Sequence, residues 1–303
     1  MKKWQILSSF WLKIIAIVTM TFDHVGLFLS YAYYSNTDIL QIASIFRAIG
    51  RLAFPLFIFM IVEGVIHTKN IKKYFFRLGI FALILSIVFI VVEYSSLNKY
   101  SDVSGFLRSG NIFMELLLIA IGVYALKEKG WKKLLILLPI VISSLSFIVK
   151  GLERTRPIDI HWFPAFLTFN YDWVGVLLGI GFYYSYTLAD TYINVTSNTT
   201  KMDKDIWMMN GNYRLLVNII AAFVNLVDYV FYYSFIYIWP NAAFITNKDA
   251  MVQLLAIISG AFILLDNGNR GYNSKWFQLG AYIYYPLHVL ILIVIYIIMN
   301  GGL

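Results

Sequence analysis

The chain has 303 residues, of which 60% are hydrophobic and only 13% are charged, and its mean hydropathy is +0.73. Because soluble domains carry roughly 25% charged residues, this composition excludes an ordinary soluble domain and predicts an all-α bundle of membrane-crossing helices. The absence of cysteine excludes thiol catalysis, zinc–thiolate sites and disulfides. The net charge of +8 does not indicate nucleic acid, since basic cytoplasmic loops give a membrane protein the same sum; no nucleic-acid partner is expected.

Apolar segments recur along the whole chain and predict about nine transmembrane helices, within a range of eight to ten. The first segment is not expected to be a cleaved signal peptide. A cleavage site would need small residues after the apolar region, whereas the apolar span here continues after Asp23. The chain is thus predicted to be a single multi-pass domain, 1–303, in the cell membrane, with bilayer lipid as a partner. The expected spans are 11–30, 46–67, 75–93, 112–126, 134–149, 173–188, 215–239, 251–265 and 277–299.

The distribution of lysine and arginine predicts the orientation of these helices. If the N-terminus is cytoplasmic, sixteen of the 24 lysines and arginines lie on the cytoplasmic side, as the positive-inside rule requires. The polar stretch 190–212 is expected to be a cytoplasmic loop. The apolar stub 163–169 is too short to cross; it either dips into the bundle or lies along its outer surface.

The segment 46–77 is predicted to form one membrane-crossing helix that ends in a basic turn. It carries Arg47, Arg51, Glu63 and His67. A charge at the centre of a spanning helix costs roughly 2.5–3.5 kcal/mol on insertion scales, so function is the default interpretation of these residues. The alternative is that they snorkel to the interface or pair as structural contacts. Glu63 and His67, four apart, are interpreted as an ordinary helical pair, and no metal site is expected.

The first span has a spacing that suits an elongated donor. Lys13 and His24 are 11 residues apart, just over three turns, which places them on nearly the same face and about 16 Å apart along the axis. This spacing is expected for an acyl-coenzyme A whose phosphates lie at Lys13 and whose thioester lies at His24. Asp23 lies about 100° around the helix from His24, so it is expected to pair with an arginine rather than to orient the histidine.

Several motifs resemble the TraX family of membrane proteins. They are FDHVG at 22–26, RAIGRLAFPLF at 47–57, VEG at 62–64, HTKN at 67–70 with Tyr74, and YPLH at 285–288. The resemblance is dense from about residue 20 to 85 and returns at the C-terminus. TraX proteins are associated with N-terminal acetylation of conjugative pilin, and the family is related to the type-3 integral-membrane acyltransferases, which use cytoplasmic acyl-CoA.

The resemblance implies an acyl-CoA-dependent membrane acyltransferase with acetyl-CoA as co-substrate and no permanently bound cofactor. It would acetylate an amine or hydroxyl of a membrane-associated or exported acceptor, either a peptide N-terminus such as pilin or a cell-envelope glycan. His24 is the expected general base, with Asp23, Arg47 and Arg51 around it. The expected donor-binding residues are Lys13, His67, Lys69, Lys72, Lys73 and Arg77, and those expected to bind the acceptor are Glu63, Tyr285 and His288.

Two other functions are compatible with the same charges. A transporter or flippase could use buried Arg, Glu and His residues as a pathway, although the chain shows no internal repeat. An accessory membrane subunit could use them to contact partner helices.

The chain also departs from the family pattern after the third span and at Asn111-Ile112-Phe113-Met114-Glu115, so pilin is not carried over as its substrate.

Overall fold

The computed structural model describes residues 4–33, 35–94, 110–155, 163–200, 212–238 and 247–299. In this part of the chain the regular elements are helices, as predicted. The long ones are α1 (Ser9–Ala32), α2 (Thr37–Gly50), α3 (Ala53–His67), α4 (Ile71–Tyr94), α6 (Ile112–Lys127), α7 (Leu137–Thr155), α8 (Asp172–Thr200), α10 (Asn212–Ile238) and α14 (Lys275–Met299). The short ones are η2 (Gly130–Ile136), η3 (Ala165–Leu167), α12 (Asn247–Leu254), η4 (Leu255–Ile258) and α13 (Ser259–Leu264).

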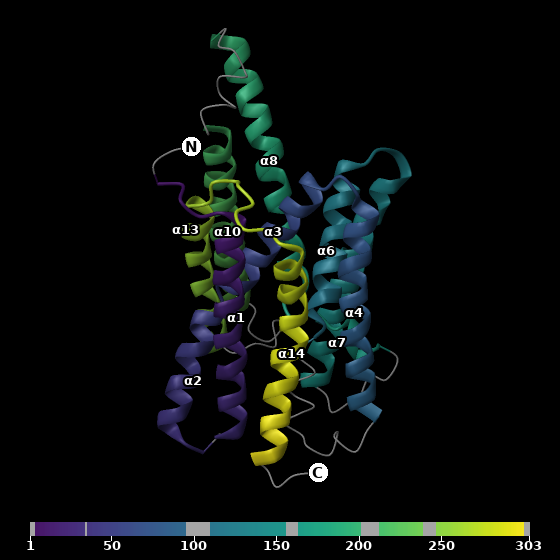
Figure 1. Ribbon diagram of the computed structural model, residues 1–303, viewed down its shortest axis with the longest axis vertical. Helices are drawn as coiled ribbons and strands as arrows, with labels where there is room; N and C mark the ends of the chain where they lie inside the picture. Colours follow the sequence, from purple (N-terminus) through teal and green to yellow (C-terminus); the bar gives the residue numbers. More distant parts are fainter. Residues whose placement is uncertain are drawn as a thin grey trace.

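The helices form an elongated bundle in which α1 and α14 run in the same direction (Figure 1). Within the described ranges, five helical stretches are long and apolar enough to cross a membrane, so the chain is a multi-pass membrane protein. The predicted total of nine crossings and the cytoplasmic N-terminus remain predictions. The five stretches are Ser9–Ala32, Thr37–His67, Gly130–Glu153, Asn212–Ile238 and Lys275–Tyr296.

The helix predicted over 46–67 is divided between α2 and α3, whereas a turn follows His67 as predicted and is shorter than expected. Helix α2 ends at Gly50, α3 begins at Ala53, and α4 begins at Ile71. Pro55 accounts for the first break: it has no N–H to donate to the carbonyl four residues earlier, and its ring clashes with that carbonyl. At the second break the backbone of Thr68 is extended, and the Asn70 side chain accepts a hydrogen bond from the Lys73 N–H at 3.0 Å.

Two other boundaries differ from the sequence-based expectations, and one open alternative is decided. Helix α8 continues through the predicted loop as far as Thr200 and projects beyond the neighbouring helices (Figure 1). The predicted span 251–265 is divided into α12, η4 and α13. The stub 163–169 contains η3 and ends at Phe169, which is fully buried, so it dips into the bundle.

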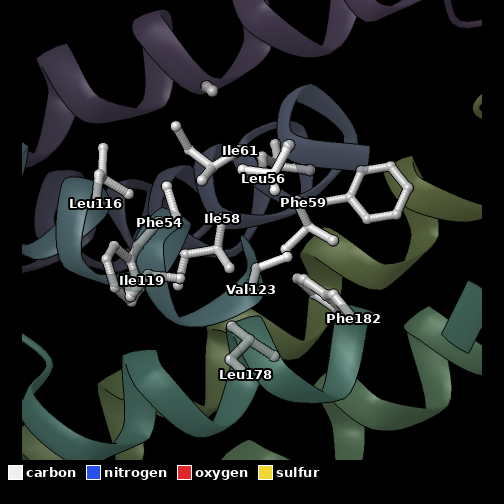
Figure 2. Packing of buried hydrophobic residues seen from close by; sticks show 14 of the residues in the cluster. Phe54, Leu56, Ile58, Phe59, Ile61, Leu116, Ile119, Val123, Leu178 and Phe182 are labelled. Atoms are coloured by element: carbon white, nitrogen blue, oxygen red, sulfur yellow. The ribbon is translucent and has the colours of Figure 1, made fainter. Parts of the chain in front are cut away.

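Helix α3 lies at the centre of the packing. Figure 2 shows its Phe54, Ile58 and Phe59 among side chains of α6 and α8. In lipid the hydrophobic effect does not drive helices together, so close packing, small residues and hydrogen bonds between helices must do so. The position of α3 therefore depends on shape and on the polar contacts at its ends.

Glycine allows α1 and α2 to approach closely. A Cβ atom added at Gly26 of α1 would lie 2.8 Å from the Ala43 carbonyl oxygen and 3.0 Å from the Arg47 nitrogen of α2. One added at Gly50 would overlap the side chain of Asp23. Both positions are buried, so the two helices meet backbone to backbone beside Asp23.

We expect Gly50→Ala to lower the stability of the protein by about 1–3 kcal/mol, because its methyl group would force Asp23 and α1 away from α2. The matched control is Gly280→Ala in α14, where an added Cβ meets no atom within 4 Å and helix propensity favours alanine. Thermal unfolding in detergent measures both. Equal melting temperatures for the two variants would contradict the close approach.

Candidate functional site

Asp23 holds two arginines together between α1 and α2. Its Oδ2 accepts a hydrogen bond from Arg47 Nη1 at 2.8 Å, and its Oδ1 accepts one from Arg51 Nη2 at 2.5 Å. Arg51 also donates through Nε to the Arg47 carbonyl and through Nη1 to Gln253 of α12, both at 3.0 Å. The prediction that Asp23 pairs with an arginine is confirmed.

The Asp23 group carries an excess positive charge and unused donors. One carboxylate against two guanidinium groups leaves a net charge of +1. Each guanidinium has five N–H donors, and the contacts described above use one on Arg47 and three on Arg51. The side chain of Arg47 is 32% exposed. The group can therefore bind an anion or stabilise an oxyanion with charge-assisted hydrogen bonds.

His24 lies next to this group and contacts α14. Its Nδ1 is 2.6 Å from Nε2 of His288, whose Nδ1 is 2.8 Å from the carbonyl oxygen of Tyr284. The Tyr285 ring packs edge-on against His24, with ring centroids 5.5 Å apart. Both arginines are close enough to His24 to interact with it electrostatically. The structure thus gathers His24, Asp23, Arg47, Arg51, Tyr285 and His288, six of the predicted site residues.

Glu63 belongs to a separate group at the other end of α3. Arg214 of α10 forms salt bridges with Glu63 and with Asp266, and Tyr186 of α8 donates a hydrogen bond to Glu63 at 2.5 Å. Asp266 follows α13 and is fully buried. Burial raises the pKa of Asp266 above that of an ordinary aspartate, while the guanidinium of Arg214 opposes the shift. Two carboxylates share one arginine, and this group has a net charge of −1.

The residues predicted to bind the donor lie around the first turns of α1, α4 and α14. Lys13 Nζ is 5.6 Å from the centre of the Phe277 ring, and Arg77 Nη1 donates to Gln278 at 3.4 Å. Lys13 and Arg77 are near enough for their charges to interact. His67 packs edge-on against Tyr186, at 6.0 Å between ring centroids. The remaining predicted residues are also exposed: Lys69 lies on the turn between α3 and α4, and Lys72 and Lys73 lie in the first turn of α4.

A third polar group holds the segment that immediately precedes α8. Glu115 of α6 is fully buried and accepts hydrogen bonds from the backbone N–H groups of Asn170 and Tyr171, at 3.1 and 3.2 Å. Lys150 forms a salt bridge with Asp172 at 2.5 Å. The Tyr171 ring stacks on Phe54 of α3. This buried carboxylate anchors the dipping segment beside the first turn of α3.

Sequence reasoning missed four polar residues of these groups. Gln253, Tyr186, Arg214 and Asp266 lie far along the chain from their partners, and their sequence neighbourhoods show no motif. The sequence does indicate that Glu63 needs a partner, because an unpaired charge in a membrane is costly, but it does not identify that partner. Among the described residues, no three His, Asp or Glu side chains are grouped as a metal site would require.

Helices long enough to cross a membrane, with charged residues paired between them, define a multi-pass membrane protein with a polar interior. A family model described as TraX protein matches residues 8–296, and the chain belongs to the TraX family. It is also 32% identical over 142 residues to the probable fimbrial assembly protein FimC, serogroup H1, of Dichelobacter nodosus. That alignment covers 46% of the chain and 54% of FimC, so it spans about half of each protein. No solved structure matches.

We expect Arg214→Met to lower stability by about 3–5 kcal/mol, because it leaves the carboxylates of Glu63 and Asp266 buried without their counter-charge. Adding Glu63→Gln and Asp266→Asn to this variant should recover part of the loss. Unfolding in detergent measures each variant. Lys132→Met, which removes an exposed ion pair with Glu128, is the control and should change stability little. A loss no larger than that of the control would show that the buried contacts do not stabilise the bundle.

Proposed function

We propose that this protein is an integral-membrane acyltransferase that moves an acetyl group from acetyl-CoA to an amine or hydroxyl of a membrane-associated or exported acceptor. Two facts support the proposal. The chain belongs to the TraX family, which is associated with pilin acetylation. Its fold also brings a histidine and two arginines together inside a helical bundle.

The observation that carries the proposal is the position of the Asp23 group beside His24. Acyl transfer needs a base for the acceptor's proton and fixed positive charge for the developing oxyanion. His24 supplies the first and Arg47 and Arg51 supply the second. Asp23 fixes the directions of both guanidinium groups in advance, which lowers the reorganisation needed during reaction.

The step balances with these residues and acetyl-CoA alone. The acceptor N or O bonds to the carbonyl carbon as His24 takes the acceptor's proton, and the carbonyl electrons move to oxygen, where the arginines stabilise the charge. When the carbonyl re-forms, the C–S bond breaks and the thiolate of coenzyme A takes the proton from His24. The products are the acetylated acceptor and free coenzyme A.

The donor would enter from the end of the bundle that holds Lys13 and Arg77. Two cations held close together suit the phosphates of coenzyme A, and His67 with Lys69, Lys72 and Lys73 would attract them. The rise of α1 separates Lys13 from His24 by about 16 Å, which matches the distance from phosphate to thioester. This end would be cytoplasmic, where acetyl-CoA is available.

The acceptor would approach the Asp23 group. Its excess positive charge suits an acceptor that carries an anionic group, and Tyr285 would contact it. The name of the partly matching relative, a probable fimbrial assembly protein, favours a peptide of a fimbrial subunit over a glycan. Glu63 is paired with Arg214, and its role as a substrate contact remains a prediction.

Replacing His24 by alanine should abolish acetyl transfer, because it removes the imidazole that would take the acceptor's proton beside the two arginines. Membranes containing the wild-type protein are incubated with labelled acetyl-CoA beside membranes containing His24→Ala, and the labelled product is identified. Gly280→Ala serves as the control for expression and folding. Equal labelling by His24→Ala and wild type would refute the proposal, and proton-coupled flux without any labelling would indicate a transporter.

Replacing Lys13 by alanine should raise the KM for acetyl-CoA about 10- to 100-fold with a smaller change in kcat, as loss of one charge-assisted contact of about 1.5–3 kcal/mol implies. Steady-state kinetics with varied acetyl-CoA measures this effect. Lys132→Ala is the matched control, since its ammonium is exposed and pairs with Glu128. An unchanged KM would place the donor elsewhere.

A further inference from the structure

The rings of His24 and His288 meet edge to edge. Their planes are inclined by only 16°, and their nearest nitrogens are 2.6 Å apart although the ring centres are 4.9 Å apart. The contact is therefore an in-plane hydrogen bond, in which the N–H of one imidazole points at the lone pair of the other. A second contact lies beside it: Thr21 of α1 donates to the Ile17 carbonyl at 2.8 Å and so accepts a hydrogen bond from the Tyr284 hydroxyl, also at 2.8 Å.

The proton positions in this pair follow from the carbonyl group at its end. A carbonyl oxygen has no proton to give, so His288 Nδ1 is the donor in its contact with Tyr284. A neutral imidazole has one N–H, which leaves a lone pair on His288 Nε2. The proton between the rings therefore belongs to His24 Nδ1, and the lone pair of His24 lies on Nε2.

This arrangement stays intact when His24 gains a proton. The incoming proton binds Nε2, while Nδ1–H remains hydrogen-bonded to His288. The opposite arrangement would put a proton on Nε2 in the resting state and remove the base. In the serine proteases a carboxylate selects the tautomer in the same manner; Asp23 cannot do so here, because both of its oxygens face arginines.

We propose that His288 is a positioning residue that fixes the tautomer of His24, so that Nε2 is the basic nitrogen of the acyltransferase. The proposal rests on the proposed function for its catalytic meaning, and it replaces the prediction that His288 binds the acceptor. His288 is suited to this role because it is 7% exposed and is itself held by the carbonyl of its own helix. Tyr284 also stacks against its ring, with centroids 4.9 Å apart.

The direct test is ¹⁵N NMR of histidine-labelled protein in lipid nanodiscs, which needs no activity. The chain has four histidines, and His24→Ala identifies the signals of His24. In the wild type the proton should lie on Nδ1 of His24, and in His288→Leu it should move to Nε2. An Nε2–H tautomer at His24 in the wild type would overturn the proposal, whether or not the protein proves to be an acetyltransferase.

The kinetic test compares His288→Leu with His288→Gln, whose amide oxygen can accept the hydrogen bond from Nδ1. The leucine variant should lose about 10²- to 10³-fold in kcat with the KM for acetyl-CoA unchanged, a loss of the size that general-base catalysis provides. Glutamine should restore at least tenfold of this, while unfolding temperatures of the two variants agree. Equal kcat values for the two variants, or an effect on KM alone, would contradict the positioning role.

Discussion

The pairing of Asp23 with Arg47 and Arg51 is the constraint on which the rest of the structure depends. Each of these charges alone would be costly inside a bilayer, by roughly 2.5–3.5 kcal/mol on insertion scales. Together they are stable only if α1 and α2 approach within backbone contact, which Gly26 and Gly50 permit. The break after Gly50 then sends α3 back into the core and leaves Arg51 at the bend, where it reaches α12 through Gln253. The close approach of α1 and α2 thus allows the ion pairs of Asp23 to form, and these ion pairs in turn hold the two helices together.

The sequence contained enough information for part of this arrangement. Hydropathy located the helical segments, and the angle between Asp23 and His24 on one helix predicted which of them would meet an arginine. Pro55 indicated a break at residues 51–52, but the continuous apolar pattern favoured an unbroken helix. The contacts of His24 with His288 and of Glu63 with Arg214 could not be predicted, because they join residues 264 and 151 positions apart. A single sequence does not show which residues of two distant helices will lie opposite each other.

Helix α3 separates two groups of opposite net charge. Its 15 residues span about 22 Å, from the positive group around Asp23 to the negative group around Arg214. The negative group lies at the end where the donor would enter, since Tyr186 contacts both Glu63 and His67. It would repel the phosphates of coenzyme A, so under the proposed function the cations Lys13 and Arg77 would have to hold them there. The positive group at the other end of α3 would then meet only the small thioester.

The contacts between α1 and α14 have a consequence for biosynthesis. Helix α1 forms hydrogen bonds with Tyr284 and His288 of α14, and the segment before it pairs with the chain at Asp266. The partners of Thr21 and His24 are therefore synthesised 263 and 264 residues after them. Under the proposed function, His24 would lack the imidazole that fixes its proton until α14 is inserted, although both arginines follow it closely in the chain. Acetyl transfer would then begin only after α14 has entered the membrane.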